Sequence, residues 1–386
     1  MTLSSHHFCR QSRALAGGLT ITLTLALAFS ADANNHRETF YQQHNLVSDG
    51  FVPADHVDNN LVNPWGISAS PATFFWVSDN GTGVTTLYNG AGNAVPLVVT
   101  IPPPAGSTDP STPTGQVFNK FNATSPTDFV VTSGGASGPS LFIFATEDGT
   151  ISGWNPAVPP PPLSKQAIRV VDNSAAGAVY KGLAIGSNAS GNFLYAANFS
   201  AGTIDVFNGS FTQVTLAGSF ADPGIPAGFA PFNVQNLGGN LYVTYAKRND
   251  ITGDDVAGPG NGFVDIFDTD GNLVRRVASG GHLNSPWGIA LAPAKGFGRF
   301  SNDLLVGNFG DGQINAYRDN GGSFEFHGKL RSKGKPITID GLWALQFGLG
   351  GANNGPTNVL FFTAGIDDER HGLFGSLTSC TVVSCP

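Results

Sequence analysis

The chain has 386 residues and a formal net charge of −8, and only 12% of its residues are charged. This mildly acidic balance argues against nucleic acid and anionic membranes as partners. Glycine (51), proline (25) and phenylalanine (29) are abundant, and no stretch has the 3.6-residue apolar period of an amphipathic helix. Such a composition is typical of a protein built from many short strands and turns.

The first 33 residues have the features of a secretory signal peptide. Arg10 and Arg13 precede an apolar run from Ala14 to Phe29, and Ala31-Asp32-Ala33 matches a cleavage site. We therefore expect a mature chain that starts near Asn34 and is secreted or periplasmic. An uncleaved anchor is the alternative, but this run and every later one fall short of the ~20 apolar residues of a transmembrane helix. We expect no stable membrane span after cleavage.

The C-terminal tail, residues 379–386, contains two of the three cysteines, Cys380 and Cys385. In an oxidising compartment these two residues can form a local disulfide, which we favour over two free thiols. The loop that it closes is short, so the disulfide would restrict the unfolded chain only modestly. A zinc site is not expected here, because structural zinc normally has four protein ligands.

Residues 34–378 are predicted to form a single domain of repeated units. The repeat is clearest at the second and third strands of each unit. Leu194–Gly209 (LYAANFSAGTIDVFNG) aligns with Leu304–Asp319 (LLVGNFGDGQINAYRD), and Phe75–Gly90 and Leu141–Asn155 fit the same template. Short apolar strands separated by Gly, Asn and Asp turns are the pattern of β-propeller blades.

Six such units fill the mature chain, so we predict an all-β, six-bladed β-propeller with four-stranded blades. The innermost strands are expected within residues 63–67, 128–132, 182–185, 232–235, 284–293 and 342–347. The strand at residues 40–48 is expected to complete the last blade and so remove the open edge of the ring. The Pro/Ser/Thr-rich stretch 102–114 is predicted to be an insertion outside the core. Seven blades or two separate β domains are the alternatives.

Several segments carry a resemblance to known families. The blade pattern P-x-G-I-A, L-Y-V-A-x-N/D, G-x-I-x-V-F resembles N-H-L and S-M-P-thirty-like six-bladed propellers. More closely, five segments are similar to a family of exported bacterial propellers of unknown function: NLVSDG (45–50), LVNPWGI (61–67), DDVAGPGNGFVDIFD (254–268), SPWGIA (285–290) and HGLFGSL (371–377). Some members carry a C-terminal sorting signal, which this chain lacks in its TSCTVVSCP ending. The resemblance implies the fold and export, but no activity.

The loops that join second to third strands, and those that enter the innermost strands, are expected to meet on one face of a propeller. This places nine polar residues as candidate ligand contacts: Asn63, Asp79, Asp128, Glu147, Asn198, Asn233, Asn284, Asn308 and Asp340. The same loops contain Asn80, Lys181, Lys247-Arg248 and Asp367-Asp368. A turn role is the alternative for each residue, because Asn and Asp often bond their own backbone after a strand.

Four of these residues, Asp79, Glu147, Asn198 and Asn308, are candidate ligands for Ca²⁺, which takes several oxygen ligands. Propeller lactonases, which this fold resembles, use such a cluster to polarise a carbonyl. The Asp-rich insertion Asn249–Gly262 lacks the spacing of an EF-hand loop. It is either a lid over a ligand or a solvated loop.

Trp65, Trp287 and Trp343 are predicted to start innermost strands. They could form a stacking surface for a ligand, but packing between neighbouring blades buries more aromatic area and is favoured. The chain contains no G-x-S-x-G nucleophile motif, no H-x-x-H or H-E-x-x-H spacing for zinc and no phosphate-binding loop. We therefore favour a non-catalytic module that presents loops to an extracytoplasmic ligand, glycan or protein. A Ca²⁺-dependent lactonase or esterase is the alternative.

Overall fold

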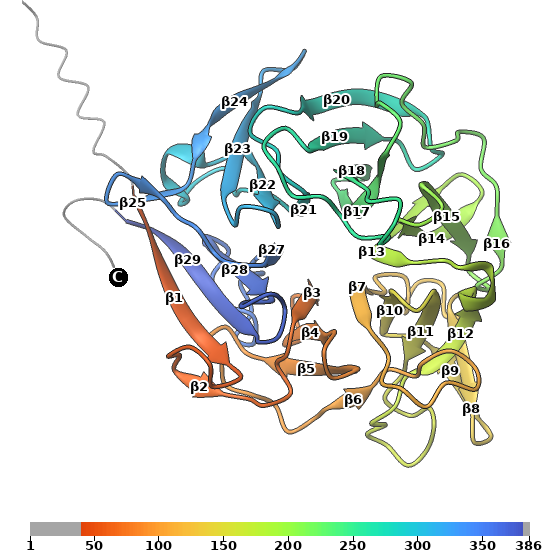
Figure 1. Ribbon diagram of the computed structural model, residues 1–386. Helices are drawn as coiled ribbons and strands as arrows, with labels where there is room; N and C mark the ends of the chain where they lie inside the picture. Colours follow the sequence, from red (N-terminus) through yellow and green to blue (C-terminus); the bar gives the residue numbers. More distant parts are fainter. Residues whose placement is uncertain (1–39, 381–386) are drawn as a thin grey trace, which may run out of the picture. The chain divides into compact units, whose positions relative to one another are not determined.

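The computed structural model describes residues 40–380, which form five four-stranded sheets and one five-stranded sheet arranged in a ring (Figure 1). All of them belong to one unit, Arg37–Pro386. The predicted six-bladed propeller is confirmed. Within the described residues, no helix is both long and apolar enough to cross a membrane. The predicted signal peptide and Cys385 lie outside the described residues, so the disulfide stays a prediction.

The first strand of each blade is innermost, and neighbouring strands are antiparallel except for the two outermost strands of blade six. Blade one has β3 (Pro64–Ser68), β4 (Phe75–Asp79), β5 (Val84–Tyr88) and β6 (Val99–Thr100), and blade two has β7 (Pro113–Phe118), β10 (Phe142–Thr146), β11 (Thr150–Trp154) and β12 (Ile168–Asp172). Blade three has β13 (Tyr180–Asn188), β14 (Gly191–Asn198), β15 (Thr203–Asn208) and β16 (Gln213–Val214). Blade four has β17 (Phe229–Leu237), β18 (Asn240–Lys247), β19 (Gly262–Phe267) and β20 (Leu273–Ser279). Blade five has β21 (Pro286–Leu291), β22 (Leu304–Asn308), β23 (Ile314–Asp319) and β24 (Phe324–Lys329).

Blade six combines both ends of the described chain. Its strands are β27 (Leu342–Phe347), β28 (Val359–Ala364), β29 (Leu373–Cys380), β1 (Phe40–Ser48) and the short β2 (His56–Val57). β1 runs antiparallel to β29 along its whole length, and the two strands lie side by side in Figure 1. This confirms the predicted closing strand. The ring therefore has no open seam between its first and last blades.

Blade two differs from the prediction. Its innermost strand is β7, which begins inside the stretch predicted to be an insertion. The segment predicted in its place forms β8 (Val130–Ser133), which pairs only with β9 (Ala136–Pro139) in a separate hairpin. β7 shares the Pro-x-Gly pattern of β3, but Thr114 replaces the tryptophan that makes the pattern easy to recognise.

Every innermost strand carries a β-bulge at the same position. The register between the first and second strands shifts there in all six blades. The residues at the bulge are Trp65, Thr114, Lys181, Phe232, Trp287 and Trp343. A bulge changes the direction of a side chain relative to the regular strand alternation. Each blade thus contributes one bulged residue close to the centre of the ring, where the innermost strands meet (Figure 1).

Glycine follows the bulged residue in four blades because the neighbouring blade lies against it. A Cβ atom on Gly66 would collide with the carbonyl oxygen of Thr114, and one on Gly115 with the backbone of Leu183. A Cβ atom on Gly288 would lie 2.5 Å from the carbonyl oxygen of Trp343. Glycine allows this close backbone approach, which keeps the central channel narrow.

Four of the bulged residues, Trp65, Phe232, Trp287 and Trp343, form what we call the aromatic plug. Trp65 stacks on Trp343 with ring centroids 3.8 Å apart, and Phe232 and Trp287 each lie 5.9 Å from Trp343. All four are buried. The tryptophans therefore pack against one another across the channel. Trp65 and Trp343 come from the neighbouring blades one and six, and Trp287 and Trp343 from the neighbouring blades five and six, so the favoured packing between neighbouring blades is confirmed. These buried rings do not form an open stacking surface.

We expect closure by β1 to stabilise the whole ring. Leu46, on β1, is 3% exposed and packs in the same core cluster as Phe374 on β29. Leu46→Ala should lower the free energy of unfolding by about 2–5 kcal/mol, because it leaves a cavity in that core. Urea denaturation followed by tryptophan emission measures this change. The matched control is Gln43→Ala on the exposed part of β1, for which about 0.5 kcal/mol or less is expected. Equal effects of the two variants would contradict the role of β1.

Candidate functional site

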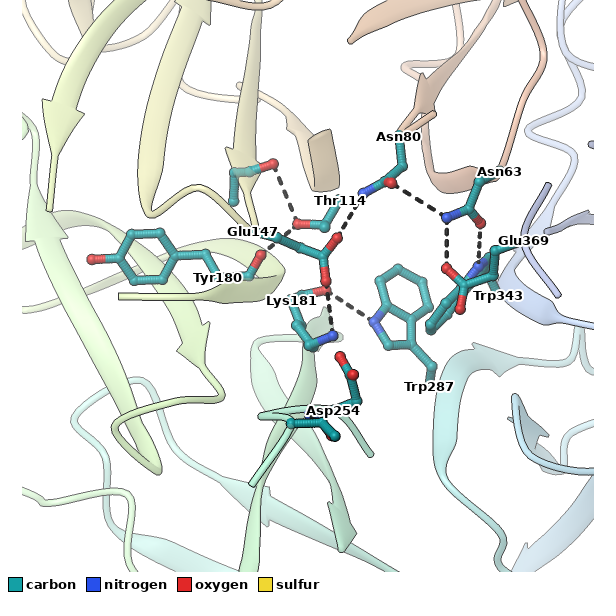
Figure 2. A network of polar contacts seen from close by, with 12 residues as sticks. Asn63, Asn80, Thr114, Glu147, Tyr180, Lys181, Asp254, Trp287, Trp343 and Glu369 are labelled. Atoms are coloured by element: carbon teal, nitrogen blue, oxygen red, sulfur yellow. Dashed lines mark hydrogen bonds and ion pairs between the residues drawn. The ribbon is translucent and has the colours of Figure 1, made fainter. Parts of the chain in front are cut away.

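A chain of polar contacts links four blades on one side of the aromatic plug (Figure 2). Asn63 Nδ2 donates to Glu369 Oε2 at 2.7 Å and contacts Asn80 Oδ1 at 3.3 Å. Asn80 Nδ2 donates to Glu147 Oε2 at 2.9 Å, and Lys181 Nζ donates to Glu147 Oε1 at 2.8 Å. These five residues, together with Asp255, are called the polar mouth below.

The turns of the fold place these groups on one face. Asn80 follows β4, Glu147 follows β10, and Glu369 lies in the connection from β28 to β29, so all three are in second-to-third strand connections. Asn63 precedes β3, and Lys181 is the bulged residue of β13. The sequence predicted that the second-to-third strand loops and the loops entering the innermost strands meet on one face. The structure shows this for some of these loops.

The plug anchors the polar mouth from below. Trp343 Nε1 donates to Asn63 Oδ1 at 2.9 Å, and Trp287 Nε1 donates to the carbonyl oxygen of Lys181 at 2.9 Å. The buried N–H of each indole therefore has a hydrogen-bond partner, and that partner belongs to a residue of the polar mouth. The side chain of Asn63 and the backbone at Lys181 are held in place before any ligand binds.

Lys181 is a buried cation, with its side chain only 6% exposed. Its ammonium lies 5.3 Å from the ring centroid of Trp65 and 5.8 Å from that of Phe232, which is favourable cation–π geometry. Burial lowers the pKa of Lys181, but the attraction of Glu147, and of Asp255 and Asp254 beyond it, raises this pKa by more. Lys181 is therefore charged at neutral pH.

The insertion between β18 and β19 covers this face. Its backbone is held to blade five, because Gly258 N donates to Asn284 Oδ1 at 2.6 Å and Gly260 N donates to the carbonyl oxygen of Leu283 at 2.8 Å. Asp254 in this insertion lies on the side of Lys181 away from Glu147 (Figure 2). Anchoring and charge thus support a covering role for the insertion over that of a purely solvated loop.

Glu369 has an unusual pKa for a glutamate. Burial raises the pKa of Glu369 to about 7, the charge of Glu147 adds to the rise, and the hydrogen bond from Asn63 and the Lys181 ammonium oppose it. The backbone there is also strained: Asp367, Asp368 and Glu369 have φ angles of 56°, 53° and 63°. Three successive non-glycine residues in the left-handed region cost free energy, and such strain is concentrated at functional sites.

Three of the predicted metal ligands have other roles. Asp79 is fully buried within blade one, where it accepts a hydrogen bond from Thr86 Oγ1 at 2.8 Å. Asn198 donates to Asp205 at 2.9 Å, and its own oxygen accepts from nearby turn groups. Asn308 donates to the carbonyl oxygen of His282 at 2.8 Å. The turn interpretation therefore fits Asn198, whose oxygen accepts from the Ala201 N–H, whereas Asp79 and Asn308 bond groups outside their own turns.

The remaining predicted contacts are dispersed. Asn284 holds the insertion, and Asp340 accepts from the backbone of Asp367 at 2.8 Å. Asn233 donates to the carbonyl oxygen of Trp287 at 2.8 Å and lines a separate cavity described below. Asp128 precedes the β8–β9 hairpin and accepts from Asn192 at 2.7 Å. Of the nine candidates, Asn63 and Glu147 are in the polar mouth.

Two members of the polar mouth, Asp255 and Glu369, were not predicted from the sequence. Glu369 directly follows Asp367-Asp368, so the acidic run in this loop was a usable signal. The sequence marks Asp255 only as part of an Asp-rich insertion. Nothing in that insertion's sequence shows that it folds back over Lys181.

Of the four predicted Ca²⁺ ligands, the polar mouth contains only Glu147. Between residues 40 and 380, no group of three or more His, Cys, Asp or Glu side chains is arranged to hold a metal ion. The Lys181 ammonium also lies among the carboxylates that a cation would need. Its charge would repel a divalent ion at that point.

Glu369 should make stability depend on pH. Its folded pKa of about 7 exceeds the ordinary 4.5, so the folded protein holds this proton more tightly than the unfolded chain does. The resulting stabilisation is complete below pH 4.5 and is lost as the pH rises towards 7. In Glu369→Gln the side chain still accepts the hydrogen bond from Asn63, but it does not ionise. Its contribution to stability is therefore not lost as the pH rises. The variant should gain stability relative to the unmodified protein across that range, as measured by thermal melts at several pH values.

Asp368→Asn is the matched control in the same loop, because the Asp368 side chain is 95% exposed. A Glu369→Gln difference that stays constant between pH 4 and 8, or that equals the control, would contradict the assignment of a raised pKa to Glu369.

No family model matches the chain. Two curated relatives cover most of it, and both are uncharacterised proteins of Acanthamoeba polyphaga mimivirus. R648 is 34% identical over 346 residues, which is 88% of this chain and 80% of R648. L690 is 35% identical over 346 residues, which is 88% of this chain and 86% of L690. The sequence resemblance pointed to bacterial proteins, whereas these relatives are viral.

Solved structures support the fold alone. A glucose dehydrogenase superposes with a TM-score of 0.53 at 11% identity, covering 87% of this chain and 99% of the other. A protein of unknown function from Bacteroides thetaiotaomicron superposes with a TM-score of 0.51 at 12% identity, covering 89% and 77%. At the identity and coverage found for the viral relatives, this chain belongs to the family of uncharacterised proteins that includes mimivirus R648 and L690.

Proposed function

We propose that this protein is a non-catalytic binding module whose polar mouth binds a glycan-type ligand that carries hydroxyls and protonated amines. The observation that carries the proposal is the convergence of charged groups from separate blades. Glu147 comes from blade two, Lys181 from blade three, Asp255 from blade four and Glu369 from blade six. Charged residues that only stabilise a blade can pair within that blade, so stabilisation alone does not require charges from four blades to meet.

The donors and acceptors of the polar mouth suit hydroxyl groups. Lys181 and the two asparagines supply N–H donors, while the carboxylates supply acceptors, and a hydroxyl can both donate and accept. Carboxylates outnumber the ammonium, so a positively charged amine on the ligand would be favoured. Phe309 follows β22 on the same face, is half-buried and stacks on Trp343 at 4.0 Å. Its exposed part offers an apolar surface to a sugar ring.

The cellular location belongs to the same proposal. The basic and apolar start of the chain and its Ala-x-Ala site support export to the periplasm or the medium. A ligand of the polar mouth would then be extracytoplasmic, such as a cell-envelope or environmental polysaccharide.

Charge should decide which glycan binds. We expect oligosaccharides of glucosamine to bind more tightly than those of N-acetylglucosamine, and oligogalacturonate to bind least, in calorimetric titrations of the purified protein. Binding of the glucosamine oligosaccharide should weaken as salt screens the charges. Asp255→Asn should weaken it by roughly 10- to 100-fold, the range expected for one hydrogen bond to a charged group.

Asp250→Asn is the matched control, because Asp250 is in the same insertion but its side chain is 77% exposed and pairs with Arg248. Equal affinity for the three oligosaccharides, or equal effects of the two variants, would overturn the proposal.

A lactone or ester hydrolase is the second candidate, and Glu369 is the observation that favours it. A carboxyl group with a pKa of about 7 is suited to general acid–base catalysis at neutral pH. If this candidate is correct, a screen of lactones and aryl esters should find a substrate, and Glu369→Gln should lower kcat by about 10²- to 10⁴-fold. The control Asp368→Asn should leave kcat unchanged. Absence of turnover across the screen would count against this candidate.

A further inference from the structure

A cavity of about 270 Å³ lies on the other side of the aromatic plug. All six blades contribute to its lining through their innermost strands, and Trp287 is the plug residue that borders it. Lys181, Glu147 and Glu369 do not line it. The plug therefore separates this cavity, called the lower cavity below, from the polar mouth.

The lower cavity exists because small residues follow the bulge. Above it, the plug fills the channel with four large rings. Below the plug, the lining includes Gly66, Ser68, Gly115, Ala184 and Ala344. These residues cannot fill the space between the six strands.

The lower cavity opens on the face opposite to the polar mouth. Asn236 in its lining lies beside the turn from β17 to β18. First-to-second strand turns of antiparallel blades lie at the opposite end from second-to-third turns, which carry the polar mouth. Lys120, also in the lining, is exposed and marks the outer end of the cavity.

The chemistry of the lower cavity differs from that of the polar mouth. Its lining contains no carboxylate, and Lys120 at the outer end is its one charged residue. Carboxamides and a hydroxyl supply the polar groups: Gln116, Asn233, Gln235, Asn236, Gln346 and Ser68.

Some of these amides are fixed and others are available. Gln116 is 6% exposed, and its Nε2 donates to the carbonyl oxygens of Gly66 and Trp76 at 2.8 and 2.9 Å. The backbone of Gln235 is paired in β17, but its side chain has no hydrogen-bond partner within residues 40–380. The side chain of Gln346 uses only its Nε2, which donates to the carbonyl oxygen of Phe347. Free amide donors and acceptors thus border the cavity at the level of blades four and six.

We infer that the lower cavity is a second binding site, specific for a neutral cyclic polyol or monosaccharide. Carboxamides recognise hydroxyl groups because they both donate and accept, and the lining offers no carboxylate to pair with a cation. The volume is just below the roughly 300–1,000 Å³ of typical small-molecule sites, which suits a single sugar ring. Trp287 supplies an aromatic edge at the inner end.

The test uses the full mature chain and three neutral probes, glucose, galactose and myo-inositol, with tryptophan emission and calorimetry as readouts. We expect saturable binding of at least one probe. Gln235→Leu, which removes free amide groups, and Ser68→Phe, which fills the cavity, should each weaken it by at least tenfold. Gln213→Leu is the matched control, because Gln213 is exposed on the outer strand β16. Asp255→Asn should leave this binding unchanged.

Three results would overturn the inference. The first is the absence of saturable binding for all three probes. The second is unchanged affinity in Gln235→Leu, which tests the site even if Ser68→Phe does not fold. The third is loss of binding in Asp255→Asn, because that would place the sugar at the polar mouth.

Discussion

The bulge at the start of each innermost strand is the constraint on which the rest of this structure depends. It directs one side chain per blade to the centre, and in four blades the glycine that follows lets the neighbouring blade approach closely. Four blades place an aromatic ring there. Blades two and three instead place Thr114 and Lys181, and the Thr114 hydroxyl donates to the carbonyl oxygen of Tyr180 at 2.6 Å. The polar mouth therefore arises where two adjacent blades depart from the aromatic pattern.

A lysine in this position is not the most stable choice that the fold allows. Burying an ammonium is costly, and even a well-paired buried ion pair often stabilises no more than apolar residues of similar size. Lys181 recovers part of this cost from Glu147 at 2.8 Å and from the faces of three aromatic rings. Glu369, another carboxyl group of the polar mouth, is held nearby by a strained loop. Structural stability alone does not account for this combination, which is why we propose a ligand-binding role for the polar mouth.

The sequence pattern predicted the architecture well because propeller blades repeat their turn residues and strand spacing. It located β1 as the closing strand and failed at β7, where Thr114 replaces the expected aromatic residue. The site was harder to predict. Asp79 and Asn80 are neighbours, yet Asp79 turns into its own blade while Asn80 reaches Glu147 of the next blade. Sequence spacing does not determine that choice, which depends on the packing of each side chain.

The two ends of the channel share one structural element, Trp287. Its indole N–H holds the backbone of Lys181 in the polar mouth, its carbonyl oxygen accepts from Asn233, and its ring borders the lower cavity. Closely packed interiors transmit small displacements rather than absorbing them. A ligand that displaces Trp287 from below would therefore disturb the hydrogen bond that positions Lys181 above. Any coupling between the two sites would be reciprocal, because a coupling free energy belongs to both binding equilibria.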